Sequence, residues 1–282
     1  MNQNKEIAVL ITCHNRAKTT ISCLSSLFAS TLPRDFSIKV YLTDDGSTDG
    51  TSRLIESMFP SVTIIQGDGL LYWNRGMHTC WKYAINRKHD FYLLLNDDVE
   101  LAPNSISNLV ILYYNSNKMS VVVGKTIDPI SGLVTYGALK RKSRISRNSF
   151  IPITTPMDVA VTFNANCILI PNSAIESVGI LDPFYTQQFG DIDLGLRFSS
   201  YDWAIVELGQ PVAVLAKNYA YTHANFILSY KEFMNLLQDP KGIPWKEWWH
   251  FLYKFNGFLA PLYFSLRYFK IVTLGARNRI RK

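Results

Sequence analysis

The sequence predicts an α/β fold in which a mostly parallel sheet is flanked by helices. Strand-like and helix-like segments alternate along the first third of the chain. The run Tyr92–Leu95 is apolar throughout, as expected for a strand covered on both faces. Polar clusters follow several predicted strands, and the carboxyl ends of parallel strands form the ligand-binding edge of an open sheet.

The composition indicates a globular protein with a full hydrophobic core. The chain has 282 residues, 48% hydrophobic and 18% charged, enough for one large domain or one domain with an appendage. Its four cysteines show neither a metal-binding spacing nor a dense disulfide pattern, which favours free thiols in a reducing compartment. The N-terminal apolar stretch is too short for a signal peptide, so we expect a cytoplasmic protein.

The first half of the chain reads as alternating strands and helices. The predicted strands cover residues 7–12, 37–42, 62–66 and 91–95. The predicted helices between them cover residues 18–29, 49–58 and 74–86. The first helix has the apolar spacing of an amphipathic helix. Right-handed crossovers are expected to bring these strands into one sheet.

The pattern loosens after Leu101. Further predicted helices cover residues 103–115, 172–178 and 191–201, and further predicted strands cover 121–124 and 159–170. Residues 138–156 are basic, rich in serine and weakly patterned, so we expect a mobile loop there. The chain contains no internal repeat.

Polar clusters follow three of the predicted strands, at residues 12–16, 44–50 and 96–98. In a parallel sheet they line one crevice. Gly46 and Asp49 are explained by a turn and a helix cap. The turn and the cap do not explain Asp44, because a carboxylate at a buried strand end is costly without a partner. A nucleobase or a ribose hydroxyl would be such a partner.

The cluster Asn96, Asp97 and Asp98 has two interpretations. Hard carboxylate oxygens at a strand end suit Mg²⁺ or Mn²⁺ and, through the metal, a diphosphate. Alternatively, the three side chains form a turn and cap the helix that follows Pro103.

The chain resembles the family 2 glycosyltransferases of the GT-A fold. Four segments carry the resemblance in the family's order and spacing, at residues 9–16, 44–51, 94–99 and 189–197. Residues 67–77 resemble the bacterial polysaccharide and rhamnosyltransferase branch. The resemblance implies a GT-A domain over residues 1–240, with a nucleotide-sugar half at about 1–100 and an acceptor half at about 101–240. Residues 241–282 then form a C-terminal helical extension.

The resemblance also implies roles in donor binding. The first nucleotide-binding loop contains Thr12, Asn15 and Arg16, and Asp44 contacts the nucleobase. Asp97 lies nearer the ribose. Further donor-site candidates are Gly69, Trp73 and Arg75, although Trp73 also fits a core position and Arg75 a solvated helix start.

The catalytic and metal-binding residues follow from the same resemblance. Asp98 is the expected ligand of Mn²⁺ or Mg²⁺, and His223 the expected late histidine of the metal or diphosphate site, with a structural histidine as the alternative. Asp191 is the expected base, with Asp193 and a helix-capping Asp191 left open. Gly190 stands where family members commonly carry glutamate.

These residue types suit an inverting, metal-dependent transfer. A carboxylate removes the proton of the acceptor hydroxyl while that oxygen attacks the anomeric carbon, and a metal neutralises the departing diphosphate. We therefore expect a sugar to move from a UDP- or dTDP-linked donor to a glycan or lipid-linked glycan acceptor in bacterial capsule or O-antigen biosynthesis. The alternatives are a nucleotidyltransferase, whose glycine-rich phosphate loop is missing, and a non-catalytic nucleotide-sugar-binding protein.

The C-terminal segment carries the whole formal net charge of +7. Residues 248–282 contain seven of the 29 basic residues and no acid, which leaves 22 basic and 22 acidic residues in the preceding chain. The segment is also aromatic, but its longest apolar stretch, 257–266, is too short to span a bilayer. We expect peripheral contact with the inner face of the plasma membrane. A helix pair packed on the domain is the alternative, and no nucleic-acid recognition module is visible.

Overall fold

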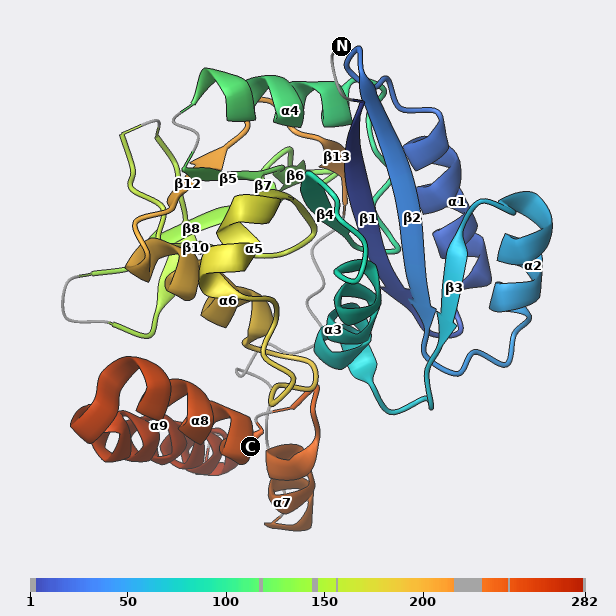
Figure 1. Ribbon diagram of the computed structural model, residues 1–282. Helices are drawn as coiled ribbons and strands as arrows, with labels where there is room; N and C mark the ends of the chain where they lie inside the picture. Colours follow the sequence, from blue (N-terminus) through green and yellow to red (C-terminus); the bar gives the residue numbers. More distant parts are fainter. Residues whose placement is uncertain are drawn as a thin grey trace. The chain divides into compact units, whose positions relative to one another are not determined.

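The computed structural model describes residues 4–116, 119–143, 147–155, 157–215, 230–242 and 244–280 (Figure 1). The chain divides into two compact units. The larger unit holds the residues up to Pro183 together with Gly190–Lys217. The smaller unit holds Phe184–Phe189 and the chain from Asn218 onward.

A seven-stranded sheet forms the centre of the larger unit, with the strand order β12-β5-β11-β4-β1-β2-β3. Neighbouring strands run parallel except β11, which is antiparallel to both β4 and β5. The predicted mostly parallel sheet is therefore confirmed. The strands are β1 (Lys5–Cys13), β2 (Phe36–Asp44), β3 (Thr63–Gln66), β4 (Phe91–Leu95), β5 (Ser120–Val123), β11 (Cys167–Pro171) and β12 (Ala204–Glu207).

Helices cover both faces of this sheet (Figure 1). In β4, Leu93 and Leu95 face one hydrophobic core, whereas Tyr92 and Leu94 face the other. This two-sided burial explains why the strand is apolar at every position. The first core includes side chains of α1 (Ala17–Phe28), α2 (Thr51–Met58) and α4 (Ser105–Asn115). The second includes side chains of α3 (Tyr72–Ala84), α5 (Asn172–Val178) and α6 (Gly190–Ser200).

Residues 138–156 contain a hairpin, so the predicted loop is wrong at its two strands, β8 and β9. Strand β8 (Ala138–Arg141) pairs with both β9 (Phe150–Pro152) and β10 (Thr162–Phe163). Burial of Ala138 and Leu139 holds β8 in place, while the Lys140 ammonium pairs with Asp158 at 2.6 Å. Residues 159–170 likewise form two strands, β10 and the start of β11, rather than one. A third small sheet contains β6 (Thr126–Ile127), β7 (Val134–Tyr136) and β13 (Ala213–Val214).

The part of the smaller unit described from residue 230 onward is mainly helical. It comprises α7 (Tyr230–Gln238), α8 (Trp245–Asn256), a 3₁₀ turn (Gly257–Leu259) and α9 (Ala260–Ile280). The Trp248 ring stacks on Phe251, and the Arg267 guanidinium lies 4.3 Å from the centre of the Trp248 ring. The backbone N–H of Thr186 donates to Glu247 Oε1 at 2.9 Å, which ties the short segment Phe184–Phe189 to α8. Within the described ranges, no helix has both the length and the hydropathy needed to cross a bilayer.

Candidate active site

The sheet register brings the three predicted polar clusters to one edge. Cys13 at the end of β1 is paired with Asp44 at the end of β2, and Leu10 is paired with Leu94 of β4. Because β1 lies between β2 and β4 and all three are parallel, residues 12–16, 44–50 and 96–98 follow adjacent strand ends. Such an edge is where open α/β sheets bind their ligands.

Arg16 and the two acids that follow β4 form an ion-pair cluster. Arg16 Nη1 lies 2.9 Å from Asp97 Oδ1, and Nη2 lies 2.9 Å from Asp98 Oδ2. The other two oxygens, Asp97 Oδ2 and Asp98 Oδ1, are buried without a hydrogen-bond partner in the described structure. Burial raises the pKa of Asp97 to about 7, although the Arg16 charge acts in the opposite direction.

This donor set fits a divalent cation. Buried carboxylate oxygens without a partner are costly, and a cation satisfies them. No cluster of three His, Cys, Asp or Glu side chains suited to a metal occurs in the described residues. Mg²⁺, however, is usually held by one or two carboxylates together with water and substrate phosphates, for which Asp97 and Asp98 suffice. The remaining expected ligand, His223, lies outside the described residues.

Side-chain hydrogen bonds join the first two loops at the sheet edge. Asn15 has a left-handed backbone, with φ of 51°. Its Oδ1 accepts a hydrogen bond from the Thr48 N–H at 2.7 Å, and its own N–H donates to Ser47 Oγ at 2.8 Å. Asp49 Oδ2 accepts from the Ala17 N–H at 3.1 Å. Asn15 therefore holds the two predicted nucleotide loops together.

Asp44 has protein partners, which the sequence argument did not anticipate. Its side chain is 1% exposed. Asp44 Oδ1 accepts a hydrogen bond from the Ser47 N–H at 2.9 Å, and Oδ2 accepts one from the Ser52 hydroxyl. The premise that Asp44 lacks a partner inside the chain is therefore wrong, because α2 returns Ser52 to the end of β2. Its contact with a nucleobase stays a prediction.

Asp45 is a site residue that the sequence reasoning missed. Its Oδ1 accepts from the N–H groups of Gly69 at 2.9 Å and Leu71 at 3.2 Å, and its Oδ2 from that of Tyr72 at 2.9 Å. One buried carboxylate thus fixes the loop that contains Gly69, which has φ of 85°, and leads into α3. The adjacent acids Asp44 and Asp45 were the available signal, because the turn explained Gly46 and Asp49 but not Asp45.

Helix α3 begins beside the acidic cluster. The indole N–H of Trp73 donates to Asn96 Oδ1 at 2.8 Å, next to Asp97. Trp73 also packs against the core, as one of the two interpretations expects, and its contact with the donor stays a prediction. Arg75 is exposed, and its Nε donates to the Pro183 carbonyl at 3.1 Å.

The close approach of β1 and α3 depends on Gly76. A Cβ atom at this position would lie 2.2 Å from Thr12 Oγ1. Thr12, predicted to belong to the first nucleotide loop, is 7% exposed. Its side chain therefore helps to fix α3 beside the end of β1.

Asp191 and Asp193 lie in the first turn of α6 but in different environments. Asp193 is fully buried and pairs with Arg197 Nε at 2.7 Å. Asp191 is partly exposed, and its carboxylate accepts hydrogen bonds from the N–H groups of Ile192 at 2.8 Å and Ala165 at 3.3 Å. Burial raises the pKa of Asp191.

Two backbone links connect Asp191 with the acidic cluster. Asp191 accepts from Ala165, the residue before Asn166. The Asn96 N–H donates to the Asn166 carbonyl at 3.0 Å, and Asn96 directly precedes Asp97. The two residues that precede β11 therefore join the helix that carries Asp191 to the strand end that leads to Asp97.

The departure from the family pattern at Gly190 has a steric cause. A Cβ atom at position 190 would lie 1.7 Å from Asn74 Oδ1. Asn74 is fully buried, and its Nδ2 donates to the Asp182 carbonyl at 2.8 Å. A glutamate at position 190 would therefore collide with Asn74 in this arrangement.

The fold and the residues at its sheet edge place the chain among the GT-A glycosyltransferases. The model of glycosyl transferase family 2 matches residues 8–172, more than half of the chain, and the chain therefore belongs to this family. Its membership places the chain in the class of glycosyltransferases. A comparison of the sequence with curated proteins found no match.

Similar solved structures agree with this fold. The mannosyltransferase PcManGT from Pyrobaculum calidifontis, in complex with GDP-Man and Mn²⁺, has a TM-score of 0.57 at 14% identity, over 98% of this chain and 74% of that one. S. aureus TarS 1–349 in complex with UDP has a TM-score of 0.54 at 11% identity, over 75% of this chain. The match spans 60% of that TarS chain. At these identities the likeness concerns the fold alone.

Proposed function

We propose that this glycosyltransferase moves a hexose or deoxyhexose from a UDP- or dTDP-linked donor to a glycan acceptor, with inversion and with a divalent cation. The observation that carries the proposal is the pair of carboxylates Asp97 and Asp98, each with a buried oxygen that has no described partner. Asp191 is linked to the same strand end through Ala165 and Asn166. PcManGT was solved with Mn²⁺ and a nucleotide sugar, and TarS with UDP, which supports the same class of donor here.

In the proposed reaction, Asp191 is the general base. Its carboxylate takes the proton from the acceptor hydroxyl as that oxygen bonds to the anomeric carbon, and the bond from that carbon to the diphosphate breaks. The raised pKa of Asp191 makes it a stronger proton acceptor than a solvated aspartate. Asp193 is unsuited to this role because its charge is engaged by Arg197.

The remaining predicted residues bind the donor. Asn15 and Asp44 order the two loops that receive the nucleotide, and Asp45 orders the loop of Gly69. Trp73 borders the acidic cluster through Asn96. A cation held by Asp97 and Asp98 would neutralise the charge that develops on the departing diphosphate.

The test is calorimetry of UDP, dTDP, GDP and CDP with and without Mn²⁺, followed by an assay of the matching sugar donors with extracted bacterial lipid-linked glycans. We expect UDP or dTDP to bind in a Mn²⁺-dependent manner and its nucleoside diphosphate to be released on transfer. Asp98→Ala should abolish the metal dependence. Release of pyrophosphate would instead indicate a nucleotidyltransferase, and binding without turnover a non-catalytic protein.

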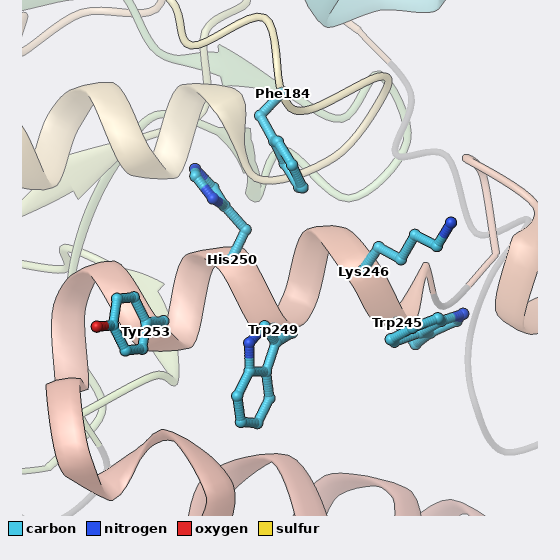
Figure 2. Close-up of a pocket in the computed structure, with 6 residues that line it drawn as sticks. All are labelled: Phe184, Trp245, Lys246, Trp249, His250 and Tyr253. Carbon is cyan, nitrogen blue, oxygen red and sulfur yellow. The ribbon is translucent and has the colours of Figure 1, made fainter.

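We further propose a lipid-linked acceptor of bacterial surface polysaccharide, such as a capsule or O-antigen precursor, met at the inner face of the plasma membrane. The smaller unit supplies the support. On α8, Trp245, Trp249 and Tyr253 are 41%, 39% and 68% exposed and recur every four residues, as one helix face does. Figure 2 shows these rings along a pocket of about 320 Å³ that is also lined by Phe184, Lys246 and His250.

The next helical segment has further exposed apolar side chains. Phe258 is 90% exposed and Phe269 is 69% exposed, with Leu262 and Leu266 exposed between them. Glu247, the one acid from residue 245 onward, is buried and bonded to the Thr186 N–H. The described surface of α8 and α9 therefore combines aromatic and aliphatic side chains with lysines and presents no carboxylate, which suits an anionic lipid surface.

A further inference from the structure

Each oxygen of the two adjacent carboxylates is either buried or bonded to Arg16 in this structure. Asp97 Oδ2 and Asp98 Oδ1 are buried, whereas Arg16 binds Asp97 Oδ1 and Asp98 Oδ2, each at 2.9 Å. A cation that binds these carboxylates therefore shares them with the guanidinium of Arg16. Two positive charges held by the same pair of acids repel each other.

Arg16 has a fixed backbone and an accessible side chain. Its carbonyl oxygen accepts hydrogen bonds from both the N–H and the hydroxyl of Thr20, each at 2.9 Å, at the start of α1. Its side chain is 43% exposed. Within the described residues, the guanidinium forms hydrogen bonds only with the two carboxylates. The side chain can therefore leave the acids without disturbing the helix start.

We propose that Arg16 is an internal counter-ion that competes with the divalent cation for Asp97 and Asp98, and that the cation releases it to bind the donor diphosphate. A guanidinium forms paired hydrogen bonds with phosphate as well as with carboxylate, so the released side chain suits its new partner. Cation and diphosphate then bind with positive coupling, and the coupling is reciprocal. The inference rests on the proposed function, because it takes the metal and the diphosphate from it.

The first experiment measures Mn²⁺ binding to the full chain without nucleotide, from the electron paramagnetic resonance signal of free Mn²⁺. We expect Arg16→Gln to bind Mn²⁺ about tenfold more tightly than the wild type, within the usual range of coupling between sites. Arg16→Lys, which keeps the charge but loses the planar fork, should fall between the two. Lys18→Gln is the matched control, because it removes the same charge from an exposed residue two positions away and should match the wild type.

Two results of the Mn²⁺ titration would contradict the proposal. Equal or weaker Mn²⁺ binding by Arg16→Gln would overturn the proposal, and so would an absence of Mn²⁺ binding in all variants. A circular dichroism melt of each variant verifies that the fold is intact, and Arg16→Lys preserves the test if the glutamine variant does not fold.

The second experiment tests whether the Arg16 side chain, once released from the acids, binds the diphosphate. UDP and dTDP are the probes. The coupling factor is the ratio of nucleotide affinities with and without Mn²⁺, corrected for the complex of Mn²⁺ with the free nucleotide. We expect the factor to be severalfold smaller in Arg16→Gln than in the wild type. An unchanged factor would overturn the transfer of Arg16 to the diphosphate.

These measurements separate the inference from the proposed function. Mn²⁺ binding is recorded without a donor sugar, so an inactive chain can still yield a result. Tighter Mn²⁺ binding in Arg16→Gln, lost again in the double variant with Asp98→Asn, would support the inference even if no sugar transfer were found. Sugar transfer together with unchanged Mn²⁺ binding would overturn the inference and leave the function intact.

Discussion

At the scale of single residues, the first turn of α6 separates two neighbouring acids by their partners. Asp193 is neutralised by Arg197, which also donates to the carbonyls of Val178 and Ile180, each at 2.8 Å. Asp191 has hydrogen bonds but no cationic partner in the described structure, and burial raises its pKa. One acid therefore stabilises the fold, and the other retains a basic carboxylate.

Replacing Asp191 with asparagine is expected to abolish sugar transfer without loss of stability at neutral pH. General-base catalysis contributes roughly 10²–10⁴-fold to rates, which sets the expected loss of kcat. The native pKa of Asp191 lies above its unfolded value, so its ionisation opposes folding. The Asp191→Asn variant should therefore melt at the wild-type temperature at low pH, and at an equal or higher temperature once Asp191 ionises in the wild type.

The control is Asp193→Asn, which leaves the buried Arg197 without its carboxylate and should cost about 3 kcal/mol in a urea titration. The pH profile of kcat/KM provides a second measurement. Activity should fall as the pH drops through the pKa of Asp191, at a higher pH than an ordinary aspartate would give. Full activity of Asp191→Asn would exclude it as the base.

The steric explanation for the glycine at position 190 can be tested by substitution. Gly190→Ala places a methyl group against Asn74 and should lower the free energy of unfolding by about 1–3 kcal/mol. Gly209→Ala is the matched control, because a Cβ atom there meets nothing within 4 Å. Equal stability of the two variants in urea would contradict the explanation.

Residue types predicted the cluster at the sheet edge, but not the partners of each residue. The pair Asp97 and Asp98 was visible because two acids after a buried strand are uncommon without a ligand. Asp44 and Asp45 share one motif, yet one carboxylate binds Ser47 and Ser52 and the other the loop of Gly69. That division depends on where α2 and the later loop return, which a linear pattern does not contain.

At the scale of elements, uniform burial made two strands easy to predict. β4 and β5 are buried at every position, and both were expected. The hairpin of β8 and β9 was missed, because its strands are short and the lysine and arginine of β8 resemble a solvated loop. Pairing with β10 stabilises this hairpin, and that partner is too distant in sequence to appear in a local pattern.

The conformation of the loop after β3 is expected to depend on Asp45. Asp45→Ala removes the acceptor of three backbone N–H groups, so we expect at least about 2 kcal/mol of lost stability and weaker nucleotide binding. Hydrogen exchange of residues 67–72 should accelerate. Asp68→Ala is the control, because Asp68 is exposed and, among the described residues, accepts only from the Leu70 N–H, at 2.9 Å. Unchanged exchange in Asp45→Ala would show that the loop is held by other contacts.

At the scale of the whole molecule, charge and apolar surface are concentrated in one part of the chain. The basic and acidic residues that precede Trp248 balance, and the excess of +7 lies after it. The same segment holds exposed aromatic side chains on α8 and α9 that no described hydrophobic core covers. A surface with both properties is expected to bind an anionic bilayer more strongly than a neutral one.

This expectation is tested by sedimentation of the full chain with vesicles of phosphatidylglycerol or of phosphatidylcholine. We expect binding to the anionic vesicles that weakens with added salt, since surface charge attraction is screened.

The double variant Phe258→Ser and Phe269→Ser should reduce binding by about tenfold or more, because each exposed ring contributes apolar area on insertion. Its folding should be intact, because both side chains are largely exposed. Ile130→Ser, at a side chain that is 95% exposed in the larger unit, should bind as the wild type does. Equal binding by all three chains, or no preference for the anionic lipid, would remove the membrane from the proposal and leave the glycan of the acceptor as the partner of this surface.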